Sequence, residues 1–374
     1  MKKFAGLLFI LGGICLSCTN TVKTEDGDTE SAPIKIDISK EGKDAGFPLF
    51  EYDSTHVFPT TRDLDVPEDG AGLPDGRLVV ADDTDGLHLI EKDGSHRIFG
   101  KMKEKGYKEG GARGVFLEDN NKFLLVSCVY SGKIFRINIE TEDTEMIYQH
   151  SYGVNNVYRD KKGSIWFSQS SNNPNGTSEA LDDAFATPIP TGAVYMLKEG
   201  RKDNEEMEAK LVADSLYFAN GITMDKDEEH LFVAEFRIDR ILRFKIDREK
   251  DTLSEKQHYA FVLSPDNLET DENGNLWLAS LIQNKILAID KDDQSIHNVF
   301  SAPSPDNSKK QLEWVLKTHL GESIIDIGEP EMWKPLNNPL TGVFWSHDRS
   351  TVYFTGLGNA LLRYDYDSEI EILD

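Results

Sequence analysis

The chain has 374 residues, of which 66 are acidic and 41 basic, and its formal net charge is −25. This length is sufficient for one large β domain or for two domains of ordinary size. The charge balance argues against nucleic acid as a partner, because binding a polyanion requires a basic surface.

The N-terminal segment predicts secretion. Lys2 and Lys3 precede the apolar run FAGLLFILGGICLS, which is too short to remain in a bilayer as a spanning helix. The run ends at Cys18 and resembles a bacterial lipoprotein signal, in which residues 1–17 are removed and Cys18 carries the lipid. This predicts a protein of the cell envelope, attached to the membrane only through the N-terminal lipid. Ordinary secretion with cleavage nearby is the alternative.

Residues 18–45 predict a tether. The segment TNTVKTEDGDTESAPIKIDISKEGKDA is polar and acidic and contains no aromatic residue. Such a composition cannot bury enough apolar surface to fold alone, so we expect a disordered link between the lipid and the folded part.

From residue 46 onward the chain repeats one unit, which consists of a polar turn, an apolar strand, a short gap and a second strand. The first strands of the six copies begin near Leu78, Phe123, Ile165, Leu231, Leu276 and Val352. Hairpins at a period of roughly 40 to 50 residues are typical of propeller blades. The sequence therefore predicts a single six-bladed β-propeller over residues 46–374.

Two intervals between the copies are longer than the others and contain insertions. Residues 172–190 predict a polar loop bounded by prolines, and residues 301–340 predict a short helix around Leu312 to Leu320. Long loops on one face of a propeller often cover a central site.

A polar residue precedes each of the six first strands by about ten positions, at the same phase of the repeat. These residues are Glu68, Arg113, Asn155, Asn220, Asp266 and Thr341. Six-fold repetition places equivalent positions on a ring around the central channel, so four oxygen ligands would point to one place: Glu68, Asn155, Asn220 and Asp266. Two carboxylates and two carboxamides favour Ca²⁺, with Mg²⁺ or Mn²⁺ next. Taken singly, each residue could instead be an ordinary turn former.

Three segments resemble the strictosidine-synthase-like and gluconolactonase superfamily: NNVYRDKKGSIWFSQSS, FANGITMDKDEEHLFVAEFRIDRILRF and PDNLETDENGNLWLA. This resemblance implies a six-bladed propeller with a divalent ion on its axis. It carries the family's ligands to Glu68, Asn155, Asn220 and Asp266, with Asn267 as a fifth. By the same resemblance, Asp266 is the expected general base.

The sequence departs from the family pattern at two relevant positions. Arg113 stands where paraoxonase-like members have a histidine, so a histidine-assisted mechanism is not expected there. Arg113 could bind a substrate carboxylate or the developing oxyanion, or it could simply pair with an acid in the channel. The last blade has no acidic residue at the position of the strictosidine synthase glutamate, which argues against that reaction.

The leading expectation is a Ca²⁺-dependent hydrolase of small lactones or esters. The alternative is a non-catalytic propeller that binds a ligand or partner and keeps a structural metal.

Overall fold

The structure is a computed structural model that describes residues 19–23, 29–33, 46–108, 111–198 and 208–366. The chain divides into two units, at about residue 40. In the first unit, β1 (Thr19–Lys23) pairs antiparallel with β2 (Thr29–Pro33), within the segment predicted to be a tether. The predicted signal and Cys18 lie outside the described residues.

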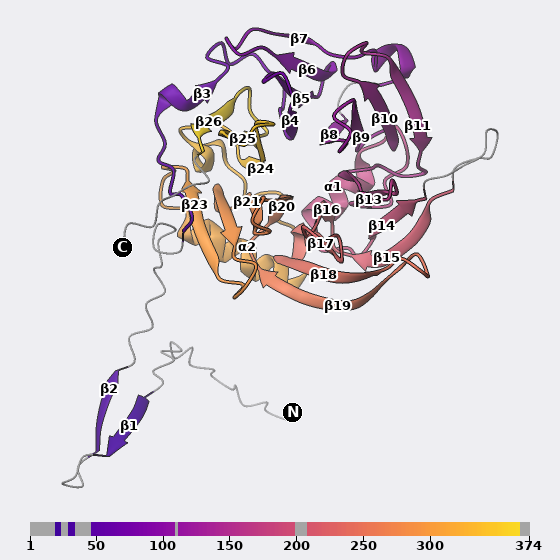
Figure 1. Cartoon of the computed structure of the whole chain (residues 1–374). Helices are drawn as coiled ribbons and strands as arrows, with labels where there is room; N and C mark the ends of the chain where they lie inside the picture. Colours follow the sequence, from indigo (N-terminus) through magenta and orange to yellow (C-terminus); the bar gives the residue numbers. More distant parts are fainter. Residues whose placement is uncertain (1–18, 24–28, 34–45, 109–110, 199–207, 367–374) are drawn as a thin grey trace, which may run out of the picture. The chain divides into compact units, whose positions relative to one another are not determined.

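The second unit is a ring of six four-stranded antiparallel sheets, which confirms the predicted six-bladed propeller (Figure 1). The inner strands are β4 (Gly70–Gly72), β8 (Ala112–Leu117), β12 (Val157–Arg159), β16 (Ala219–Met224), β20 (Pro265–Thr270) and β24 (Leu340–Trp345). The second strands are β5 (Leu78–Asp82), β9 (Phe123–Cys128), β13 (Ile165–Gln169), β17 (His230–Glu235), β21 (Leu276–Ser280) and β25 (Thr351–Gly356). They begin within one residue of the predicted starts.

Two further strands complete each blade. The third strands are β6 (Gly86–Ile90), β10 (Lys133–Asn138), β14 (Gly192–Leu197), β18 (Arg240–Asp247), β22 (Lys285–Ile289) and β26 (Leu361–Asp365). The outer strands are β7 (His96–Ile98), β11 (Thr144–Gln149), β15 (Lys210–Leu216), β19 (Thr252–Phe261), β23 (Ile296–Ser301) and β3 (Val57–Phe58). Among the described residues, four short 3₁₀ segments occur: η2 (Ser54–His56), η3 (Lys103–Lys105), η4 (Phe236–Ile238) and η5 (Pro330–Trp333).

The last blade is completed by the beginning of the propeller sequence. β3 pairs antiparallel with β26, with Val57 opposite Leu362 and Phe58 opposite Leu361. The ring is therefore closed by backbone hydrogen bonds between segments about 300 residues apart in the chain.

Aspartate turns fix the start of two second strands. Asp271 Oδ1 accepts hydrogen bonds from the backbone N–H groups of Asn273 and Asn275, and its Oδ2 accepts one from Trp277 Nε1. Asp160 makes the equivalent bond to Trp166 Nε1. Both indoles are buried in apolar clusters that join neighbouring blades, so these tryptophans belong to the core.

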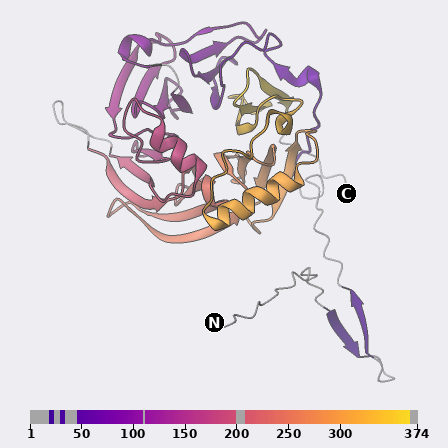
Figure 2. The same cartoon turned by 180° about the vertical axis from the view of Figure 1, so that it is seen from behind.

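The insertions form a helical cap on one face of the ring (Figure 2). It consists of α1 (Glu179–Ala186), α2 (Ser308–Leu320) and η5. α2 includes the predicted helix, whereas α1 corrects our prediction that residues 172–190 form only a loop. α1 forms because Glu179–Ala186 contains good helix formers and places Leu181 and Ala184 on one buried face.

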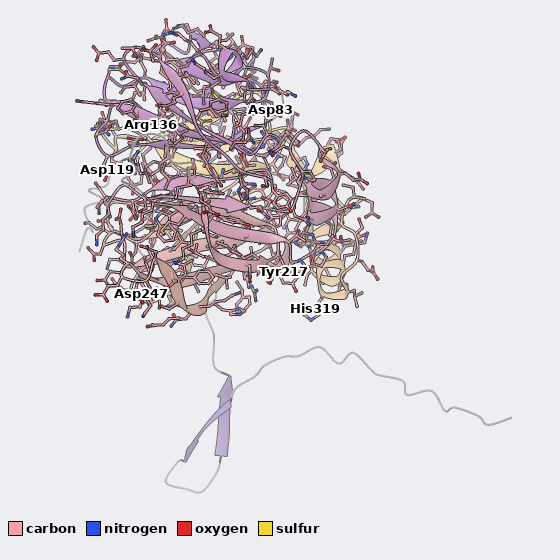
Figure 3. All side chains as sticks on the ribbon, turned by 90° about the vertical axis from the view of Figure 1, so that its right-hand side faces the viewer. Asp83, Asp119, Arg136, Tyr217, Asp247 and His319 are labelled. Atoms are coloured by element: carbon pink, nitrogen blue, oxygen red, sulfur yellow. The ribbon has the colours of Figure 1, made fainter. Side chains whose placement is uncertain are left out.

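Figure 3 shows the cap from the side, with Asp83 and His319 on the side of the helices and Asp119 on the opposite side. Within the described residues, no helix is both long and apolar enough to cross a membrane.

Candidate metal centre

The six residues of equal phase all lie at the N-terminal ends of the inner strands. Arg113, Asn220, Asp266 and Thr341 are the second residues of β8, β16, β20 and β24, and Glu68 and Asn155 lie two residues before β4 and β12. Because the inner strands of neighbouring blades contact one another around the channel, these positions form one ring of side chains. We call these six residues the axial ring.

Glycines allow the inner strands to approach closely at this level. A Cβ on Gly221 would lie 2.6 Å from the Cα of Asn267, and one on Gly114 would lie 2.9 Å from the Cα of Asn156. Neither distance is compatible with a side chain, because backbone atoms occupy the space. The pairs Asn220-Gly221 and Arg113-Gly114 therefore combine an axial polar group with a tightly packed neighbouring blade.

Four side-chain oxygens of the axial ring are buried and have no hydrogen-bond partner in the described part of the chain. They are Glu68 Oε2, Asn155 Oδ1, Asn220 Oδ1 and Asp266 Oδ1. The four residues are 3–5% exposed. A buried polar atom without a partner is costly and uncommon in a folded protein, so such a group calls for an explanation. These are the four residues that the repeat phase predicted as ligands.

Neighbouring groups orient the ring side chains. Asn155 Nδ2 donates to Ser170 Oγ over 2.9 Å, which leaves its carbonyl oxygen as the free atom. The backbone oxygen of Glu68 accepts hydrogen bonds from Thr341 Oγ1 at 3.0 Å and Thr355 Oγ1 at 2.8 Å. Thr341, the sixth axial residue, therefore holds the backbone next to Glu68.

Asn267 differs from the four residues with unpaired oxygens, because both polar atoms of its carboxamide have protein partners. Its Nδ2 donates to Glu68 O over 3.2 Å, and its Oδ1 accepts from Asn156 Nδ2 at 3.5 Å. The side chain thus connects the blade of β20 to the blades of β4 and β12.

Arg113 pairs with two acids. Its guanidinium forms a short ion pair with Asp83, and Arg113 Nε lies 4.0 Å from Glu68 Oε2. Arg113 Nη1 also donates to its neighbouring carbonyl, Ala112 O, over 2.8 Å. The pairing with a channel acid, one of the two roles left open for this residue, is therefore present in the structure.

Burial keeps protons on the ring carboxyls when no cation is bound. It raises the pKa of Glu68 to about 7. The positive charge of Arg113 partly lowers this pKa, and the negative charge of Asp83 raises it further. Burial and the nearby Glu68 also raise the pKa of Asp266 well above its usual range, and the amide of Asn220 offsets part of this. A cation beside these two carboxyls would lower the pKa of both, because its positive charge favours their ionised forms.

A second group of potential metal ligands has its charges satisfied by the protein. Ligand atoms of Asp82, Asp85 and His88 lie within 4.8 Å of one another. However, Lys103 Nζ lies 2.6 Å from Asp85 Oδ1, and Asp82 Oδ1 accepts from two backbone N–H groups. His88 also contacts His96, with 2.8 Å between their Nδ1 atoms. These acids have hydrogen-bond partners, which the four axial oxygens lack.

The fold and the ring define a six-bladed propeller with a buried oxygen-rich centre. Residues 70–308 match the model of the SMP-30/Gluconolactonase/LRE-like region, and the chain belongs to this family. This confirms the resemblance found in the sequence.

A strictosidine synthase-like 7 protein of Arabidopsis thaliana is 24% identical over 225 residues, which are 58% of this chain and 56% of that protein. The chain spans about half the length of the curated relatives that it matches.

Solved structures share the fold at low sequence identity. A gluconolactonase from Xanthomonas campestris is 16% identical with a TM-score of 0.57, and the match covers 81% of this chain and 87% of that one. A calcium-binding regucalcin from Agrobacterium tumefaciens is 12% identical with a TM-score of 0.50, covering 69% and 80%.

Taken singly, the residues that hold the ring side chains in place carry no recognisable signal in the sequence. Asp83 stands in the hairpin segment ADDTDG, where an aspartate resembles any other turn residue. Thr355 lies within β25 and Ser170 directly follows β13, and neither carries a signal of a site by itself. Ser127, Ser168 and Thr355 are hydroxyl residues of second strands that each donate to the backbone oxygen of an axial residue, and this repeated hydroxyl is the pattern that could have identified Thr355.

Proposed function

We propose that this protein is a divalent-metal-dependent hydrolase of lactones or esters, with Ca²⁺ held by Glu68, Asn155, Asn220 and Asp266. The observation that carries the proposal is the set of four buried oxygens without hydrogen-bond partners. Leaving each of them unpaired costs about 1–3 kcal/mol, and a cation on the axis would remove that cost. Carboxylate and amide oxygens without sulfur or imidazole are the donor set that Ca²⁺ prefers.

The family and the similar structures support the same function. The chain belongs to the SMP-30/Gluconolactonase/LRE-like family, and proteins of similar fold include a gluconolactonase and a calcium-binding regucalcin. Asn267, the fifth ligand implied by the sequence resemblance, remains a proposed ligand through its Oδ1, and its Nδ2 also holds the backbone of Glu68.

Two residues would perform the chemistry around the cation, and a third would position one of them. A bound divalent ion supplies a Lewis acid for the scissile carbonyl. Asp266, a buried carboxylate of the axial ring, would accept the proton of the attacking water. Arg113 would stabilise negative charge on the substrate, and Asp83 holds its guanidinium in place.

The test is hydrolysis of a panel of lactones and aryl esters by the full chain. We expect turnover that disappears after treatment with EDTA and returns with Ca²⁺. Turnover that survives complete removal of metal would contradict the proposal. Calcium binding without hydrolysis of any member of the panel would favour the alternative, a ligand-binding propeller with a structural metal.

We also propose that the protein is anchored to a bacterial membrane by a lipid on Cys18, on the basis of its N-terminal segment. Replacement Cys18→Ala should move the protein from the membrane fraction to the soluble fraction. If the variant stays in the membrane fraction, the lipid is not the anchor.

A further inference from the structure

A polar pocket of about 520 Å³ lies between the blade of β8 and the segment that leads into α1. Apart from the glycine Gly176, every described residue that lines it has a side chain with an N–H or O–H group, and none has a carboxylate. Two of these side chains are lysines, Lys108 and Lys133. This composition is unusual in a chain with 66 acidic residues among 374 and a net charge of −25. We call this cavity the basic pocket.

The two lysines have N–H groups available for a ligand. Lys133 is half-buried, and its Nζ donates to the backbone oxygen of Gly106, which uses one of its three N–H groups. Lys108 has no hydrogen-bond or ion-pair partner in the described part of the chain, and the same holds for the hydroxyl of Tyr130. A cavity with two positive charges and no negative charge attracts an anionic group.

Hydrogen bonds fix the walls of the basic pocket. Gly176 N donates to Tyr130 O over 2.8 Å, and Asn175 Nδ2 donates to His150 O over 2.8 Å. Gln149 Nε2 donates to the same oxygen of His150 over 3.1 Å. These bonds join the segment before α1 to the residues that follow β9 and β11. The pocket is therefore formed before a ligand binds, which reduces the entropy that binding would cost.

The basic pocket lies close to the axial ring in the chain of contacts. A Cβ on Gly111 would lie 3.8 Å from Tyr130 N and 3.9 Å from Lys108 O. Gly111 O also accepts a hydrogen bond from Val129 N over 2.7 Å. Arg113 of the ring follows Gly111 by two residues, which is roughly 7 Å along a strand. A ligand of the pocket is therefore a near neighbour of the ring.

We propose that the basic pocket binds the anionic group of a small molecule, a carboxylate or a phosphate. Its volume is within the range of about 300–1,000 Å³ that is usual for sites of small ligands. The lysine ammonium groups would supply the charge, and the neighbouring hydroxyls and amides would supply further hydrogen bonds. A cation would find no carboxylate there, and a neutral ligand would leave both positive charges unpaired.

The test is isothermal titration calorimetry of the metal-free full chain with inorganic phosphate, phenyl phosphate and benzoate. Removal of metal prevents these probes from binding a cation in the axial ring. We expect at least one of them to bind once per chain, and more weakly as the salt concentration rises. Benzamide, the neutral analogue of benzoate, should not bind. Absence of binding by all three anions, or equal binding of benzamide and benzoate, would overturn the inference.

Three lysine variants locate the binding. Lys133→Met should weaken it at least about fivefold, because a charge-assisted hydrogen bond is lost. Lys108→Met should also weaken it, and this exposed residue can be replaced without loss of a described contact. Lys226→Met is the matched control, because Lys226 Nζ also donates to a backbone oxygen, that of Glu272 at 3.0 Å, but lines a different pocket. Equal weakening in the control would mean that the probes respond only to overall charge, which would contradict the proposal.

A pair of lactones shows whether the anionic group belongs to the substrate. γ-Lactones with an ω-carboxyalkyl chain are compared with the corresponding carboxamides on the calcium-loaded full chain. If the substrate carries the anion, kcat/KM should be about five- to tenfold higher for the acid at a favourable chain length, and Lys133→Met should remove the difference. Equal values for acid and amide, with the probes still bound, would support a separate small ligand in the pocket. If no lactone is hydrolysed, the proposed function fails, whereas the titrations still decide this inference.

Discussion

Asp266 is the residue on which the proposed chemistry depends most. It is a ligand candidate with one unpaired oxygen, and it is the proposed base. Replacement Asp266→Asn keeps the shape and a carbonyl ligand but removes the charge and the proton acceptor. We expect turnover to fall by about 10²–10⁴-fold, the usual contribution of a general base, in steady-state assays at saturating calcium.

Glu269→Gln provides the control for this substitution. Glu269 lies on the same strand and is also a carboxylate whose pKa is raised by burial, to about 7, but it faces the pocket beside Phe344 and Arg349. Its replacement should leave calcium affinity and turnover unchanged. If Asp266→Asn retains both metal and full turnover, the assignment of the base is wrong.

The buried carboxyls also predict an unusual dependence of stability on pH in the metal-free protein. The pKa of Glu68 is about 7 in the folded state and near 4.5 when unfolded, so the folded state holds the proton more tightly between these values. Its contribution is present below about pH 4.5 and is lost as pH rises through 7, by roughly 3 kcal/mol for this group. Carboxyls with a lowered pKa, such as Glu118, titrate below this window.

Thermal unfolding in EDTA measures the effect. The melting temperature should fall between pH 5 and pH 7.5. Saturating calcium should reduce the fall by the part due to the ring carboxyls, because the bound cation requires ionised carboxylates, and should leave the part due to Glu269, whose pKa is also about 7. A metal-free melting temperature that rises over this range would argue against buried, protonated ring carboxyls.

At the level of single residues, the repeat was sufficient to identify the axial ring. Glu68, Asn155, Asn220 and Asp266 share one phase, and an equal phase in a closed propeller means an equal height on the axis. The contacts of Arg113 and Asn267 were not predictable in the same way. Whether Arg113 faces a substrate or pairs with Asp83 depends on distances between blades, which the spacing along the chain does not contain.

Among the elements, the cap depends on one buried arginine. Arg237 is fully buried and donates to Phe185 O, Ala186 O and Glu322 O, and to Thr318 Oγ1. It thereby joins the C-terminal ends of α1 and α2, where a positive charge is favourable. Burial lowers its pKa to about 10, so it stays charged at neutral pH.

Replacement Arg237→Met should loosen the cap while the blades remain folded. The substitution keeps an unbranched side chain at this position but leaves four acceptors without their donor. We expect this to lower the stability of the cap by about 2–4 kcal/mol. We expect faster hydrogen exchange in residues 179–186 and 308–320, with the exchange of the inner strands unchanged. Thr318→Val, which removes only one of the four acceptors, should have a much smaller effect. Uniformly faster exchange would mean that Arg237 supports the whole propeller.

The elements of the blades were easier to predict than those of the insertions. A strand such as Leu276–Ser280 is a continuous buried run that follows an aspartate turn and recurs in each repeated unit, so six copies reinforce one another. α1 has eight residues, occurs once, and lies between Pro174 and Pro188 in a polar segment. Its apolar face can be recognised as buried only when the residues against which α1 packs are known.

For the whole molecule, closure of the ring brings the axial residues together. β3 contributes only two residues, yet it completes the last blade and joins the two ends of the propeller. No periodicity predicts such a short strand, because its partner lies about 300 residues away. The number of blades, by contrast, follows from the repeat, and a closed six-bladed ring requires the equivalent residues to converge.

Calcium binding by isothermal titration calorimetry tests the central claim most directly. The full chain should bind one Ca²⁺, and Glu68→Gln and Asp266→Asn should each weaken binding by at least about tenfold, because each removes a charged ligand. Asp82→Asn, in the acidic group whose charges are already paired, should have no effect. An undiminished affinity in the two ring variants, or loss of binding in Asp82→Asn alone, would place the metal elsewhere and contradict the account.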